Sequence, residues 1–337
     1  MEQERMAFLD SAKGLAIFLM VFAHCIAWNL DDYQSVLLFS PEQSERNTIA
    51  GLLNQIIYSF HMPLFFLISG YLTQAPTNKQ YLNKVLRRSK QLLIPWITTG
   101  FIMLYIKGYY GYWFLLSLWQ LCISGYLFHY TSSFLNKNKK MSIDIVIIFV
   151  YFILFKILFN EQYKIYNIEV CKFLIFFPAY FFGIFIRKYT KLTDILFQLK
   201  YISLYYITFG VLFSLRYLEF ITAENALYIL INKINEYVLP IIGSLAVILY
   251  FKNRTTPIKV LQILGVKSLS IYIFHILFVI QIPIVGEWII TQSPVTCITL
   301  QLVYHSILSF IAIGLSLVLE NIISYAKPIK TILLGSK

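Results

Sequence analysis

Residues 11–29 read SAKGLAIFLMVFAHCIAWN, an apolar run of membrane-spanning length. A transmembrane helix needs about 20 predominantly apolar residues. The run carries a cation, Lys13, near its start and an imidazole, His24, in its second half. Ionisable side chains inside a membrane helix are costly to bury, so each is a candidate functional residue. This stretch therefore predicts a first transmembrane helix that carries part of a site.

The rest of the chain repeats this apolar pattern. Its 337 residues are 58% hydrophobic and only 13% charged, whereas a soluble domain has about 25% charged residues. Apolar segments of suitable length lie at residues 11–29, 51–73, 91–107, 113–134, 143–159, 170–186, 201–218, 236–251, 268–286 and 295–320. The sequence predicts an all-α polytopic integral membrane helix bundle of about ten transmembrane helices. No other stretch is long enough for a soluble core, so we expect one domain over residues 1–337.

The charges predict how this bundle is oriented. If the N-terminus is cytoplasmic, the inner segments hold 21 Lys and Arg residues and the outer loops hold 3, namely Arg46, Lys164 and Lys233. Cytoplasmic loops concentrate Lys and Arg. We therefore expect both termini and residues 74–90 in the cytoplasm, residues 30–50 outside, and a multi-pass protein of the plasma (inner) membrane. The net charge of +12 is spread over short loops, which argues against a nucleic-acid partner.

Three ionisable residues lie along the first helix. Lys13 and His24 share a face, because eleven residues at 100° each differ from three whole turns by only about 20°. Asp10 lies three residues before Lys13, close enough to pair with it. The same spacing also fits a snorkelling lysine and a structural histidine that bonds a backbone carbonyl, so the spacing leaves both interpretations open.

A second polar group lies in the next apolar segment, where residues 59–71 read SFHMPLFFLISGY. Pro63 removes a backbone donor, and membrane helices tolerate this where protein or a cavity satisfies the freed carbonyls. His61 precedes this break, and Ser69 and Tyr71 follow it. The pattern predicts either a polar pocket or a structural kink with a hydrogen-bonded histidine.

Two further groups of residues are candidates. Residues 265–275 read GVKSLSIYIFH, and they place His275 about one helical turn beyond Tyr272. Arg87, Arg88 and Lys90 precede the third helix. Such cations can fix topology and contact anionic lipid, or bind a phosphorylated cytosolic ligand. His129 and His305 have no comparable setting, and we interpret them as packing or interface residues.

These motifs, in this order, resemble those of membrane acyltransferase family 3. The matching stretches are RMAFLDSAKGLAIFLMVFAH (5–24), SFHMPLFFLISGYL (59–72), YWFLLSL (112–118), FPAYFFGIFIRK (177–188) and LGVKSLSIYIFHILF (264–278). The family's basic-x10-His motif falls on Lys13 and His24, which implies that His24 is catalytic. Its Arg-x-x-Arg motif for acyl-coenzyme A matches imperfectly. Arg88 takes the first position and Gln91 the second, and Arg87 with Lys90 is an alternative frame.

The resemblance implies an O-acyltransferase that moves an acyl group, commonly acetyl, from cytoplasmic acyl-CoA to a hydroxyl of an extracytoplasmic or lipid-linked surface polysaccharide. His24 would act as general base or as a transient acyl carrier. His61, Ser69 and Tyr71 would contact the oxyanion or the acceptor, with Asp10, Lys13, Tyr272 and His275 in support. Arg87, Arg88 and Lys90 would bind the donor phosphates.

Acetyl-CoA, or another acyl-CoA, would be the donor substrate. We expect no permanently bound cofactor and no metal. The expected partners are acyl-CoA, the carbohydrate and the bilayer, and the sequence leaves the oligomeric state open. A transporter or translocase of a polysaccharide or lipid-linked glycan is the alternative, since it too needs polar groups in the membrane.

Overall fold

The computed structural model describes residues 6–30, 51–75, 80–108, 110–159, 164–165, 168–217 and 226–335. The predicted outer loop at 30–50 lies outside these ranges except for its first residue, and so do its charged residues, including Arg46. The helices are α1 (Ala7–Asn29), α2 (Leu52–Leu72), α3 (Tyr81–Lys107), α4 (Trp113–Leu135), α5 (Met141–Leu158), α6 (Phe173–Lys188), α7 (Thr190–Leu196), α8 (Ile202–Tyr217), α9 (Ala226–Lys252), α10 (Lys259–Val266), α11 (Ser268–Phe278), α12 (Pro283–Ile290), α13 (Pro294–Ser324) and α14 (Lys327–Leu334). A 3-10 turn covers Leu199–Tyr201, and the two-residue strands Lys164–Ile165 and Ile168–Glu169 pair antiparallel.

Several helices have the length and composition of membrane spans. Among the described residues these are α1, α2, α5, the Asn232–Lys252 part of α9, and α13. The count of five rises to seven if each of two bent pairs, α6 with α7 and α10 with α11, is one span. The fold therefore agrees with an all-α membrane bundle. Ten spans and cytoplasmic termini stay predictions.

The helices cover the predicted apolar ranges with one clear exception. The prediction of a single helix over 268–286 is wrong, because α11 ends at Phe278 and α12 begins at Pro283. Proline has no N–H to continue a helix, and it disfavours helical geometry in the residue before it. In addition, α3 starts at Tyr81 rather than at 91, because the basic segment continues the helix.

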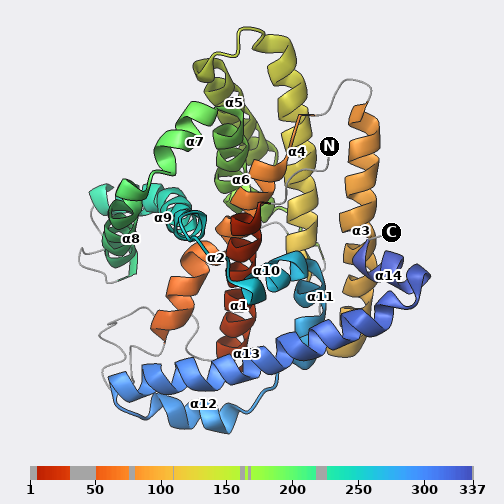
Figure 1. The fold of residues 1–337 in the computed structure, drawn as a ribbon, viewed down its shortest axis with the longest axis vertical. Helices are drawn as coiled ribbons and strands as arrows, with labels where there is room; N and C mark the ends of the chain where they lie inside the picture. Colours follow the sequence, from red (N-terminus) through yellow and green to blue (C-terminus); the bar gives the residue numbers. More distant parts are fainter. Residues whose placement is uncertain are drawn as a thin grey trace. The chain divides into compact units, whose positions relative to one another are not determined.

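The chain forms two compact units, each described by itself. Unit 1 comprises Met1–Phe65 and Leu196–Glu320. In it α1 packs against α9, α10, α11 and α12, and α8 packs against α9 (Figure 1). Helix α10 meets α11 at a bend of 85°. Because of this bend, α10 and α11 both pack on α1 although they run in different directions. Helix α1 therefore contacts several consecutive elements of the C-terminal half.

The crossing of α1 and α10 is unusually close. A Cβ atom on Gly14 would lie 1.8 Å from the Leu261 carbonyl oxygen, and one on Gly265 would lie 1.8 Å from that of Asp10. Small residues let membrane helices approach to backbone contact. The two glycines therefore set the position of α10 on α1.

The far end of α1 is joined to the break between α11 and α12. The Asn29 side chain donates to the carbonyl of Ile280 at 3.1 Å and accepts from the Ile282 N–H at 2.6 Å. It also donates to the Cys25 carbonyl at 2.8 Å. These bonds satisfy backbone groups that the break in the helix leaves without helical partners. Helix α1 is thus fixed against the C-terminal elements at both ends.

Unit 2 comprises Phe66–Ile195 and Asn321–Lys337. Helix α4 packs against α3, α5 and α6, and α14 packs on α3. A buried carboxylate, Asp144, accepts from Ser132 at 2.6 Å, Asn136 at 2.9 Å and Tyr189 at 2.8 Å, and pairs with Lys188. A buried charge needs both a counterion and hydrogen bonds. This network connects α4, α5 and the end of α6.

Candidate active site

Two histidines from opposite ends of the sequence are hydrogen-bonded inside unit 1. His24 on α1 and His275 on α11 approach to 2.8 Å between Nδ1 and Nε2, respectively. Their ring centroids are 5.0 Å apart and their planes differ by 19°. The His275 ring is fully buried, and its Nδ1 lies 2.9 Å from the Ile271 carbonyl oxygen. The sequence predicted both residues as candidates, and the structure brings them together.

His61 on α2 belongs to the same cluster. Its side chain is 1% exposed, and the Nδ1–H donates to the Ile57 carbonyl at 2.7 Å. The ring packs edge-on against Tyr58, with centroids 5.0 Å apart. It lies in the neighbourhood of His24. The hydrogen bond to a carbonyl fits the structural interpretation of His61, and its position beside His24 fits the functional one.

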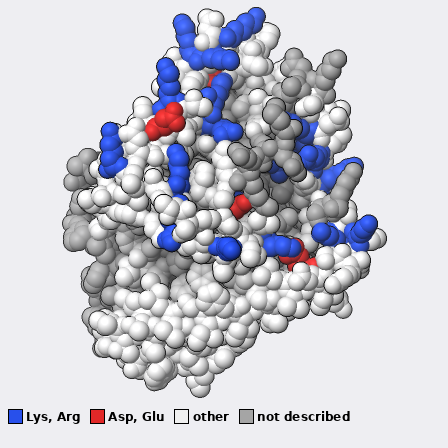
Figure 2. Space-filling view, in the orientation of Figure 1, with Lys and Arg blue, Asp and Glu red and all other residues white. Residues whose placement is uncertain are grey.

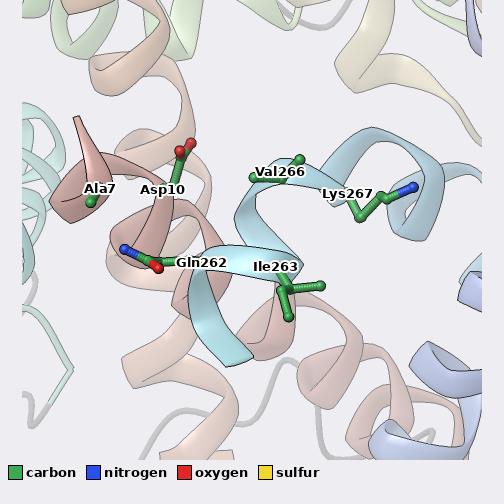
Figure 3. A pocket seen from close by; sticks show the side chains of 6 residues that line it. All are labelled: Ala7, Asp10, Gln262, Ile263, Val266 and Lys267. Atoms are coloured by element: carbon green, nitrogen blue, oxygen red, sulfur yellow. The ribbon is translucent and has the colours of Figure 1, made fainter. Parts of the chain in front are cut away.

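The predicted pairing of Asp10 with Lys13 is confirmed, at 2.8 Å between carboxylate and ammonium. Asp10 also lines a pocket of about 380 Å³ with Ala7, Gln262, Ile263, Val266 and Lys267 (Figure 3). Lys267 lies at the bend between α10 and α11, and it pairs with Glu320 at 2.6 Å. Two ion pairs therefore occur near the Asp10 end of α1.

Tyr272 on α11 lies near His275. It is 7% exposed, and its ring centroid is 6.2 Å from that of His275. Because Tyr272 and His275 are three positions apart, they lie on the same side of α11.

Within the described ranges, no three His, Cys, Asp or Glu side chains converge as a metal site would require.

Ser69 and Tyr71 belong to unit 2, where they have partners of their own. The Tyr71 hydroxyl accepts from Arg187 at 3.3 Å, and its ring lies 5.1 Å from the guanidinium carbon. The Ser69 carbonyl accepts from Thr73 at 2.9 Å. The predicted contacts of these two residues with an acceptor or oxyanion stay untested.

The basic segment before the third apolar run separates into different environments. Arg87 and Lys90 are exposed, whereas Arg88 is partly buried. Arg88 lies near Cys122 and Tyr180 and bonds Tyr126, and Gln91 lies 3.5 Å from its guanidinium. In Figure 2 Lys and Arg side chains lie along the visible surface with few acidic ones between them. No ion pair to Arg88 occurs in the part of the chain that the structure describes.

The two histidines interpreted as packing or interface residues are buried, and each lies within hydrogen-bond distance of a backbone carbonyl. His129 Nε2 lies 3.3 Å from the Thr73 carbonyl oxygen, and His305 Nδ1 lies 2.9 Å from that of Gln301. Sequence analysis missed Glu320, although an acidic side chain in an apolar helix is a recognised functional signal. It also missed Asn29, whose partners at Ile280 and Ile282 lie far along the chain.

Comparison with known proteins identifies the family of the chain. Residues 6–320 match the acyltransferase domain of acyltransferase family 3. The nodulation protein NolL of Mesorhizobium japonicum (strain LMG 29417 / CECT 9101 / MAFF 303099) is 34% identical over 87 residues, or 26% of this chain and 20% of NolL. The match thus spans about a fifth of that relative's length. No solved structure matches the chain. Because the family match covers nearly all of it, this membrane protein belongs to acyltransferase family 3.

Proposed function

We propose that the protein transfers an acyl group, acetyl in the simplest case, from cytoplasmic acyl-CoA to a hydroxyl of an extracytoplasmic or lipid-linked surface polysaccharide. Family membership supports the reaction class. The observation that supports His24 as the general base is its hydrogen bond to His275. This bond holds one nitrogen of the His24 ring in place. In the described part of the chain, the other nitrogen, Nε2, has no hydrogen-bond partner.

His24 would act as the general base in a direct transfer. The acceptor hydroxyl oxygen attacks the thioester carbonyl carbon while its proton moves to His24 Nε2. The carbon–sulfur bond then breaks, and the imidazolium returns that proton to the thiolate, which leaves as free CoA. General base catalysis typically contributes 10²- to 10⁴-fold. The transient acyl-histidine is the alternative route through the same nitrogen.

His61 would bind the acceptor rather than stabilise the oxyanion. A neutral imidazole carries one N–H, and in His61 that hydrogen is directed at the Ile57 carbonyl. Its Nε2 can then only accept a hydrogen bond. An oxyanion needs donors, whereas a sugar hydroxyl can donate. We therefore assign His61 to a second hydroxyl of the acceptor.

Arg88 would be the main contact for the phosphates of the donor. A guanidinium binds phosphate with strong, charge-assisted hydrogen bonds. Arg88 holds the first position of the family motif and is the most buried of the three candidate cations. The exposed Arg87 and Lys90 would add attraction at longer range.

The test is acyl transfer by the purified protein in lipid nanodiscs, with acetyl-CoA as donor and surface polysaccharide from cells lacking the protein as acceptor. We expect acceptor-dependent release of free CoA, and a loss of at least 100-fold in His24→Ala per unit of folded protein. His129→Ala is the matched control, since it removes a buried histidine from unit 2. If the activity of His24→Ala is within tenfold of wild type, His24 is not the general base. Polysaccharide movement without CoA release would favour the translocase.

A further inference from the structure

The bond between His24 and His275 has a direction that the backbone imposes. The Ile271 carbonyl oxygen can only accept, so the 2.9 Å contact requires a hydrogen on His275 Nδ1. A neutral imidazole carries one such hydrogen, so His275 Nε2 has a free lone pair. The 2.8 Å contact then requires the hydrogen to lie on His24 Nδ1. The lone pair of His24 is consequently on Nε2.

We propose that His275 is a positioning residue that holds His24 in the tautomer with Nδ1 protonated and makes Nε2 the basic atom. This inference rests on the proposed function only for the identity of the proton donor. The logic is that of a triad, in which a third group selects the tautomer of the base and orients its ring. Here the third group is a neutral imidazole, anchored by the Ile271 carbonyl.

His275 also stabilises the charge that forms on His24. When Nε2 takes the proton of the acceptor hydroxyl, His24 becomes an imidazolium, and its Nδ1–H bond to His275 becomes charge-assisted. Such bonds are about twice as strong as neutral ones. The proton leaves through the same Nε2 when the thiolate departs, so His275 ends the reaction as it began.

The packing of unit 1 holds the two rings at this distance. Near one end of α1, Gly14 and Gly265 bring α10 to backbone contact. Near the other, Asn29 bonds the backbone at Ile280 and Ile282, just after α11. Helix α11 lies between these two attachments, so its position relative to α1 is defined on both sides of His275. A site built on such rigid elements keeps its geometry without substrate.

Two substitutions at His275 separate positioning from packing. The amide oxygen of His275→Gln can reach the place of Nε2 and accept from His24, whereas that of His275→Asn reaches only the place of Nδ1. We expect His275→Gln to keep kcat within about tenfold of wild type. His275→Asn should lower kcat by about 10- to 100-fold, the loss typical when a partner that orients a functional histidine is removed, with KM for acetyl-CoA unchanged. Equal losses in the two variants would assign His275 to packing.

The tautomer itself can be observed without any reaction. Nitrogen-15 solid-state NMR of the imidazole-labelled protein in bilayers distinguishes protonated from bare ring nitrogens, and subtraction of the His24→Ala spectrum assigns His24. We expect a protonated Nδ1 and a bare Nε2 in wild type, with the two exchanged in His275→Asn. His129→Asn should leave the His24 signals unchanged. A bare Nδ1 in wild type would overturn the inference. The expected spectrum in a protein that releases no CoA would overturn only the proposed function.

Discussion

Arg88 differs from the neighbouring cations because its guanidinium is partly buried. Placing a charged group away from water is costly unless it is paired or hydrogen-bonded. The groups near it are Cys122, Tyr126, Tyr180 and Gln91, which are uncharged in their ordinary states. An anionic ligand would therefore gain more binding free energy at Arg88 than at its exposed neighbours, because water competes least with the interaction there.

This difference gives a prediction for donor binding. Arg88→Gln should weaken acetyl-CoA binding by about 10- to 100-fold, because a hydrogen bond to a charged group contributes about 1.5–3 kcal/mol. Arg87→Gln removes an equal charge from the exposed neighbour, and it should change the Kd by less than about fivefold. Isothermal titration calorimetry in nanodiscs measures both. Equal effects would assign the segment to topology and lipid contact alone.

Residue spacing could predict some of the site but not its central contact. Asp10 and Lys13 are three residues apart on one helix, so their pairing follows from helix geometry. His24 and His275 are 251 residues apart. Only the packing of α11 on α1 brings them together, and no local pattern encodes that packing. The sequence marked each histidine as a candidate because an imidazole is costly in an apolar helix.

At the scale of elements, the crossing of α1 and α10 depends on two residues without side chains. Gly14→Ala would place a methyl group against the Leu261 backbone, which cannot rotate away as a side chain could. Overpacking of this kind costs about 1–3 kcal/mol. The displaced α10 continues into α11, so the change should also alter the distance between His24 and His275.

We therefore expect Gly14→Ala to lower both the melting temperature in detergent and the acyl-transfer rate per folded protein. Gly314→Ala on α13 is the control, since its methyl group would meet no atom within 4 Å. That substitution should leave stability unchanged or raise it by up to about 1 kcal/mol, because alanine favours the helix more than glycine does. A Gly14→Ala protein as stable and active as wild type would contradict the close crossing.

Apolar run length predicted where most helices lie, but it could not predict the break after α11. Residues 279–282 read VIQI and are as apolar as the helices around them. The local signal was Pro283, and proline also lies inside unbroken helices of this chain, namely α2, α3, α6 and α9. Asn29 supplies hydrogen-bond partners to the backbone of this break, and that contact is tertiary.

At the scale of the whole molecule, the orientation rests on charge rather than on geometry. The described residues contain five to seven candidate spans by length and composition, and the charge distribution favours ten. Short spans explain part of the difference. Helix α11, with 11 residues, and α8, with 16, fall below the length of a regular span. Sidedness measured at several points along the chain can decide the count.

Single cysteines at four positions make this test, with a membrane-impermeant maleimide applied to intact cells. The four native cysteines are free and buried, so they should give little background. Ten spans predict labelling from outside at Gln43→Cys and Gln292→Cys, and protection until lysis at Lys79→Cys and Lys139→Cys. Gln43 and Lys79 lie outside the described residues, whereas Lys139 is exposed and Gln292 is partly exposed.

The pair Lys139 and Gln292 is the most informative. Ten spans place five crossings between them, so their labels must differ in sidedness, and losing any one short span reverses the result. The excess of Lys and Arg in the predicted inner segments makes the opposite arrangement costly. Labelling of both positions from the same side would contradict the ten-span arrangement. Because the proposed reaction needs a cytoplasmic donor and an outer acceptor, labelling of Lys79→Cys from outside would contradict the assignment of Arg88 to acyl-CoA as well.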